Sequence, residues 1–312
     1  MKFDVSDSLE FGVEIETHLP DTSPIEVGRY HSGKPVRSGP SFQGRYWSAE
    51  FDRSILAPDG RKPCEFVSPR LIGAKGIDAL RDFVAFAAGS GASVNRSCGL
   101  HVTVGLRRLL GLGFSDSLIA RHIGTQLCPL AHYHRLGVYA STGKGRHLPN
   151  PNGVWYSAPI QAKWGDFRNV LTNDAEPASL RLKLRELAEK SGRGYMSLLK
   201  VNSADPAIEF RVFGATLEWP EVQLHVATAL GLVSRSTTLG APMTFGTPNP
   251  ARNPVEAFDA LAGALGWTSP RSSFFGFGHG GCLAKPGEIA TCVQVGIRNS
   301  KNFQELFGCP AV

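Results

Sequence analysis

Two acidic residues recur at alternate positions of an apolar stretch near the start of the chain. The segment FGVEIE places Glu14 and Glu16 two residues apart, with Val13 and Ile15 at the intervening positions. Residues i and i+2 of a β-strand point to the same face. As a strand, this segment would therefore carry two carboxylates on one face and an apolar surface on the other.

Two later segments repeat this division into a polar and an apolar face. GLHVTVG places His101 and Thr103 on one face, and AIEFRVF places Glu209 and Arg211 on one face, with apolar residues opposite in both. Glu65, in CEFVSP, belongs to a less regular alternation. A sheet with one solvated face would give the same pattern. If the strands are neighbours, however, their polar faces pool several carboxylates, an imidazole and a guanidinium.

Pooled carboxylates repel one another, and a divalent cation relieves that repulsion. Glutamates with one histidine and no thiolate suit Mg²⁺ or Mn²⁺ better than zinc. The sequence has no HExxH motif, and His132 and His134 fall in an expected loop, where such pairs are usually solvated. The same residues could also serve a metal-dependent amide or phosphoester hydrolase, in which His101 would position a water.

The segments that carry these residues resemble the amidoligase family, a group of carboxylate–amine ligases related to glutamate–cysteine ligase and glutamine synthetase. The matching motifs occur in the family's order and spread over about two-thirds of the chain: FGVEIE (11–16), EFDRSI with CEFVSP (50–55 and 64–69), NRSCGLHVTVG (95–105) and VNSADPAIEFRVFGATLE (201–218). One departure is Thr103, which stands where the family often has a second histidine.

The resemblance implies an active-site funnel formed by a curved antiparallel sheet, in which two or three Mg²⁺ (or Mn²⁺) ions hold the phosphates of ATP. The metal ligands it implies are Glu14, Glu16, Glu65, His101 and Glu209, with Asp52 assisting Glu65. Arg211 is placed like the arginine that steadies the transferring phosphoryl group, and Glu16 and Glu209 are expected beside it in the catalytic centre. The implied activity is an ATP-dependent carbon–nitrogen ligase that forms an acyl phosphate and acts on small-molecule or peptide carboxylates and amines.

Apolar periodicity and turn residues predict the elements that position these side chains. Expected strands are 9–16, about 46–55 and 64–71 around a Pro58-Asp59-Gly60 turn, 99–106 and 207–219. Expected helices are 74–88, 115–128, 177–191, 220–239 and 255–265. Segments 20–46 and 129–165 are expected to be irregular, and the last stretch of the chain is glycine-rich. This order predicts an α+β fold with helices on the outer face of a largely antiparallel sheet. We expect a single catalytic domain over 1–312, with the sheet core at about 5–219 and a helical, glycine-rich part at 220–312.

Two loops could close over such a site, the irregular 129–150 segment and FFGFGHGG (274–281). Lys144 and Arg146 in the first loop could bind the phosphates of ATP, or they could be ordinary solvated charges. The surrounding VYASTGKGR lacks the spacing and the Ser or Thr of a phosphate-binding Walker A loop.

Composition narrows the class of protein. The formal net charge is +6, but the basic residues are dispersed, which gives little support to a nucleic-acid-binding function. Six cysteines without CxxC spacing indicate free thiols in a reducing compartment. No apolar run approaches the roughly 20 residues of a membrane span. The first residues lack the pattern of a signal peptide, so the expected location is cytoplasmic.

Overall fold

The computed structural model describes residues 9–106, 121–142, 196–197, 205–237, 251, 253–267 and 286–307 of the 312-residue chain. Within them lies an eight-stranded sheet in the order β2-β5-β6-β1-β8-β10-β9, with β7 also paired to β1. Every strand pair in it is antiparallel. The strands are β1 (Glu10–Pro20), β2 (Lys34–Pro35), β5 (Ser48–Glu50), β6 (Arg61–Val67), β7 (Leu71–Ile72), β8 (Gly99–Gly105), β9 (Met196–Ser197) and β10 (Ala207–Gly214). The predicted α+β class with a largely antiparallel sheet is confirmed.

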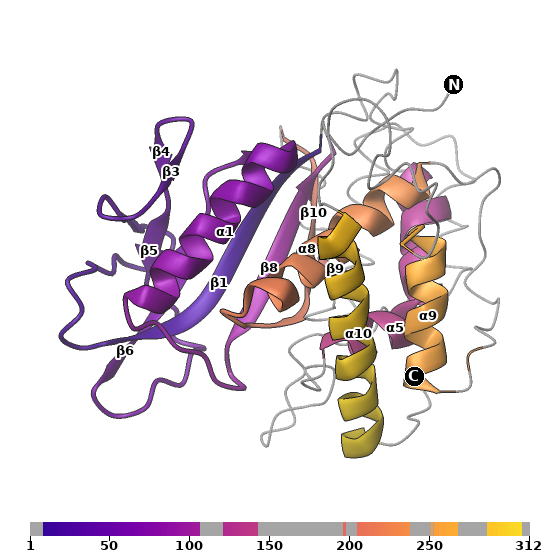
Figure 1. Ribbon diagram of the computed structural model, residues 1–312. Helices are drawn as coiled ribbons and strands as arrows, with labels where there is room; N and C mark the ends of the chain where they lie inside the picture. Colours follow the sequence, from indigo (N-terminus) through magenta and orange to yellow (C-terminus); the bar gives the residue numbers. More distant parts are fainter. Residues whose placement is uncertain are drawn as a thin grey trace.

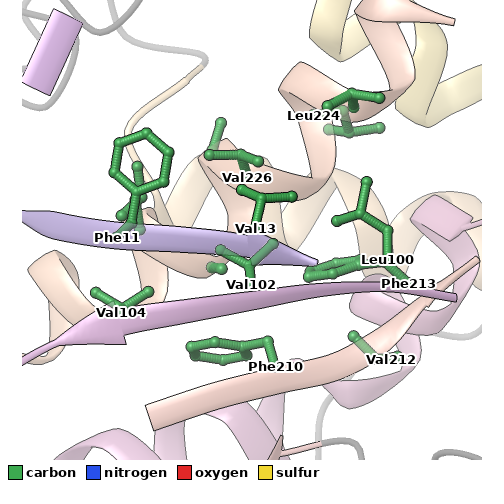
Figure 2. Close-up of a cluster of buried hydrophobic side chains, with 14 of the residues drawn as sticks. Phe11, Val13, Leu100, Val102, Val104, Phe210, Val212, Phe213, Leu224 and Val226 are labelled. Carbon is green, nitrogen blue, oxygen red and sulfur yellow. The ribbon is translucent and has the colours of Figure 1, made fainter. Parts of the chain in front are cut away.

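The apolar face of the sheet forms the core. Val13, Val102 and Phe210 follow one another across β1, β8 and β10 and are almost completely buried. Figure 2 shows these side chains packed with Leu224 and Val226 of the helix α8. Alternation in all three strands therefore leaves the opposite face to the polar residues, as the sequence predicts.

Two long helices lie against the apolar face, α1 (Gly73–Gly89) and α8 (Trp219–Ser236) (Figure 1). Helix α1 inserts Phe83, whose ring stacks on Trp47 with centroids 3.8 Å apart and meets Phe66 of β6 edge-on. Helix α8 begins with Pro220 in its first turn, where the missing N–H is not needed. Both helices were expected within a few residues of these bounds.

A second group of helices packs beside α8: α5 (Arg135–Thr142), α9 (Pro254–Ala264) and α10 (Pro286–Phe307). Gly296 of α10 lies directly against the ring of Phe258 in α9, where an added Cβ would come within 1.9 Å of Cζ. A glycine is required at this crossing because the two helices approach so closely.

Three expectations need correction or limits. Residues 129–142 are not irregular: after the π-helical η2 (Ile123–Leu127) they form α4 (Cys128–Tyr133) and α5, so His132 lies in a helix and His134 is the single turn residue between the two helices. No helix was expected after about residue 265, where the sequence indicated only a glycine-rich stretch, yet residues 286–307 form the 22-residue helix α10. In both places buried apolar side chains pack on neighbouring helices, and such tertiary contacts outweigh local turn residues. The expected helix at 177–191 lies outside the described residues.

The segment before β5 also carries a small separate ribbon, β3 (Ser41–Phe42) with β4 (Arg45–Tyr46). Four cysteines, Cys64, Cys98, Cys128 and Cys292, are buried free thiols. Among the helices of the described segments, none is both long enough and apolar enough to cross a bilayer.

Candidate active site

The polar face of the central strands gathers carboxylates around one buried histidine. His101 is 2% exposed, and its Nδ1 lies 3.2 Å from Oε2 of Glu14, 3.9 Å from Oε1 of Glu65 and 3.8 Å from Oε1 of Glu209. Its Nε2 lies 3.6 Å from Oε1 of Glu16. The register explains part of this convergence, because Glu14 pairs directly with His101. Five residues from four strands, predicted as one cluster, therefore do lie together.

A row of three carboxylates crosses the sheet beside His101. Glu16 of β1 pairs with Glu65 of β6, which in turn pairs with Glu50 of β5. All three are nearly buried. Burial, followed by the charges of Glu14, Glu16, Asp52 and Glu50, raises the pKa of Glu65 from 4.5 to about 9.

Glu50 was not predicted from the sequence. Its alternation with Ala49 was a usable signal, because Ser48 and Glu50 share the polar face of a short strand. Asp52 follows directly after that strand, and its Oδ1 accepts a hydrogen bond of 2.6 Å from the N–H of Ser54.

Arg211 lies on the polar face at an irregularity in the pairing of β10. Phe210 pairs with Val102 and Phe213 pairs with Leu100, so two residues, Arg211 and Val212, lie opposite the single residue between them on β8. This is a β-bulge, which re-aims a side chain and breaks the local ladder. The Arg211 guanidinium donates a hydrogen bond to Glu209. Burial is the largest single effect and lowers its pKa, but the charge and hydrogen bond of Glu209 together with the charges of Glu14 and Glu16 raise the pKa of Arg211 above the usual value, so Arg211 stays cationic.

These side chains line an open cavity of about 380 Å³. Its walls carry the guanidinium of Arg211, the imidazole of His101 and an aromatic rim formed by Tyr30 and His31. They also carry five carboxyl groups, those of Glu14, Glu50, Asp52, Glu65 and Glu209. Tyr30 and His31 come from the loop before β2, and their ring centroids lie 3.8 Å apart. No sequence pattern indicated these two residues, because their loop was expected only as an irregular insertion.

The donor set fits a hard divalent cation. Glu14, Glu65 and His101 each offer a ligand atom within 4.8 Å of the others, and so do Glu16, Asp52 and Glu65. Nε2 of His101 is buried and makes no hydrogen bond within the described part of the chain. Carboxylate oxygens with one imidazole suit Mg²⁺ or Mn²⁺. One carboxylate oxygen of Glu16 already accepts a hydrogen bond from the N–H of Gly99, so the other oxygen is the one that can coordinate a cation.

Some predicted residues cannot be placed. Lys144, Arg146 and the glycine-rich segment 274–281 lie outside the described residues. Thr103, at the position of the missing second histidine, pairs with Gly12 and with Glu209 on the polar face.

Comparison with known families supports the resemblance drawn from the motifs. Residues 7–109 match the model of a family described as "putative amidoligase enzyme". This segment contains Glu14, Glu16, Asp52, Glu65 and His101 of the cluster, whereas Glu209 and Arg211 lie beyond it. A comparison of the sequence with curated proteins found no match.

A comparison with solved structures found similar chains, including the following two. One is the complex between the prokaryotic ubiquitin-like protein Pup and its ligase PafA, with 11% identity and a TM-score of 0.45 over 97% of this chain. The other is a glutamine synthase homolog, with 10% identity and a TM-score of 0.41 over 96% of this chain. The chain spans 65% of the length of the first and 67% of the second.

Proposed function

We propose that this protein is an ATP- and Mg²⁺-dependent ligase that joins a carboxylate to an amine. The observation that carries the proposal is the convergence of Glu14, Glu65 and His101, each offering a ligand atom within 4.8 Å of the others, in an open cavity that also holds Arg211. The match of residues 7–109 to the amidoligase model supports the same activity.

Glu14, Glu65 and His101, with Glu16, Asp52 and Glu209 around them, would hold the cations. When bound, Mg²⁺ neutralises the charge that develops on phosphate oxygens. Without cations this cavity would repel a nucleotide, because its walls carry five carboxyl groups against one guanidinium.

The reaction would proceed in two steps, phosphoryl transfer to the acid and attack by the amine. A carboxylate oxygen of the acid attacks the γ-phosphorus of ATP, the bond from that phosphorus to the bridging oxygen breaks, and ADP leaves with the electron pair. The amine nitrogen then attacks the carbonyl carbon of the acyl phosphate, phosphate leaves, and the proton released by nitrogen passes to solvent. Arg211 would bind the transferring phosphoryl group, since a guanidinium matches the geometry of phosphate oxygens.

Product release from ATP tests this proposal. The full chain is incubated with Mg-ATP and a mixture of amino acids and small amines, and ADP and phosphate are measured with each component left out in turn. We expect release only when acid and amine are both present. Glu65→Gln should abolish it, whereas Glu305→Gln, which changes an exposed glutamate at the end of α10, should not.

Two results would overturn the proposal. The first is turnover of ATP that is unchanged in Glu65→Gln. The second is cleavage of an amide or phosphoester without ATP by the wild-type chain but not by Glu65→Gln, which would assign the cluster to a metal-dependent hydrolase.

A further inference from the structure

A second cavity, of about 270 Å³, opens on the polar face of the sheet beside the candidate metal ligands. Glu14 and Val67 line both cavities, so the two lie side by side. Strand β1 explains the hollow: Glu10, Gly12 and Glu14 point to the same face. Because Gly12 has no side chain, the space between the two glutamates stays open.

The wall of this second cavity is acidic. Arg70 links two of its carboxylates, with NH1 3.2 Å from Oε2 of Glu10 and NH2 2.9 Å from Oδ2 of Asp205. Glu14 adds a third carboxylate at the boundary with the first cavity. Three carboxylates against one guanidinium leave an excess of negative charge that favours a cation and repels an anion.

The apolar parts of the wall suit a short hydrocarbon chain. Pro69, Pro206 and Ala207 contribute apolar atoms to the lining, and Thr103 adds a hydroxyl. A volume of about 270 Å³ lies just below the roughly 300–1,000 Å³ of sites for drug-sized ligands. The occupant is therefore small or is the end of a longer side chain.

We propose that this cavity binds the amine substrate, held as an ammonium ion between Glu10, Glu14 and Asp205, with its hydrocarbon part against the apolar wall. The inference rests on the proposed ligase function and adds the place and charge state of one substrate. The nitrogen would then sit at the boundary marked by Glu14, next to the cavity where the acid is activated, and would pass one proton to solvent before its lone pair attacks. An ammonium ion leaves water only where carboxylates replace its hydration, and this wall supplies them.

Gly12 offers a test that spares the fold. A Cβ added to Gly12 would meet only Oγ of Ser68, at 3.7 Å, which is ordinary contact. Gly12→Val therefore fills the hollow and introduces a residue that favours strands. Gly89→Val is the matched control, because a Cβ added to Gly89 meets nothing within 4 Å.

Binding is measured directly by ligand-observed NMR on the full chain, without ATP. The probes are butylammonium, the neutral 1-pentanol and the anionic pentanoate. We expect butylammonium to bind, and the other two to bind at least tenfold more weakly. Gly12→Val and Asp205→Asn should each weaken butylammonium binding at least tenfold, and Gly89→Val should leave it unchanged. Mn²⁺ binding in Gly12→Val reports that the neighbouring cluster is intact.

The inference is overturned if butylammonium does not bind, if 1-pentanol or pentanoate binds equally well, or if Gly12→Val binds butylammonium like the wild type. None of these readouts needs turnover. If butylammonium does not bind but ADP release is retained, the amine site is wrong and the proposed ligase function still stands. Butylammonium binding without any ADP release would instead remove the proposed function.

Discussion

Glu16 and Glu65 lie directly opposite each other in the register of β1 and β6, and both side chains are nearly buried. Like charges at directly opposed positions of a sheet are destabilising. The protein relieves this repulsion in the absence of a cation by keeping a proton on Glu65, whose pKa rises to about 9. Folding without a cation therefore favours the protonated form of Glu65, whereas cation binding requires its deprotonated form.

The stability of the metal-free protein should fall as the pH rises. Folded Glu65 keeps its proton up to about pH 9, whereas the unfolded chain releases it near 4.5, so the folded state binds more protons between these values. We expect a lower melting temperature in EDTA at pH 8.5 than at pH 5.5. In Glu65→Gln this part of the pH dependence should disappear, and the variant should be more stable than the wild type at pH 8.5. A wild-type melting temperature that rises over this window and does not differ from that of the variant would contradict the assignment.

Cation binding should strengthen as the pH rises over the same window. The cation must displace the proton of Glu65, since metal ligands bind in their deprotonated form. Titration calorimetry of Mn²⁺ at pH 7 in two buffers of different ionisation enthalpy should reveal proton release. Identical heats in the two buffers would show that no proton is displaced.

Removing the imidazole should weaken cation binding. His101→Ala deletes a nitrogen donor within 4.8 Å of the ligand oxygens of Glu14 and Glu65. Loss of even a residue that supports a metal ligand costs roughly 10–100-fold in affinity, so we expect at least that increase in the Kd for Mn²⁺. His31→Ala is a useful comparison, because His31 lines the rim of the same cavity but belongs to neither ligand group.

Arg211 should act on turnover rather than on cation binding. Arginines that bind a transferring phosphoryl group contribute about 10³-fold or more to kcat, so Arg211→Ala should lower kcat by that order. Arg211→Lys should recover only part of the loss, because an ammonium lacks the planar fork of a guanidinium. Arg298→Ala, which removes an exposed partner of Glu221, serves as the control. A change confined to the Kd for Mn²⁺ would contradict this role.

The stack between α1 and the sheet should contribute strongly to stability. Phe83→Ala removes a fully buried ring that contacts Trp47 and Phe66, and such substitutions cost about 3–5 kcal/mol. Leu306→Ala, at a position 67% exposed, should change the free energy of unfolding by less than about 0.5 kcal/mol. Urea unfolding monitored by circular dichroism measures both.

Alternation within single strands was enough to predict the central strands and the polar face of each, whereas the grouping of Glu14, Glu16, His101 and Glu209 rested on the resemblance to the amidoligase family. Alternation works because each strand has one fully apolar face, so its phase is fixed by burial. Pairing partners depend on contacts between distant segments, which is why the position of Glu50 beside Glu65 emerged only from the register. Helices α5 and α10 escaped prediction for a related reason, since they are stabilised against other helices rather than by strong local signals.

The bulge at Arg211 and Val212 divides β10 into two halves, and odd-numbered residues face opposite sides of the sheet in the two halves. Before it, odd-numbered residues face the carboxylates, and after it Phe213, also odd-numbered, lies in the core. A substitution in this stretch alters a single side chain, whereas the loss or gain of one residue would exchange the two faces along half of the strand. The number of residues between Glu209 and Phe213 is therefore fixed by the fold. This segment tolerates substitutions more readily than insertions or deletions.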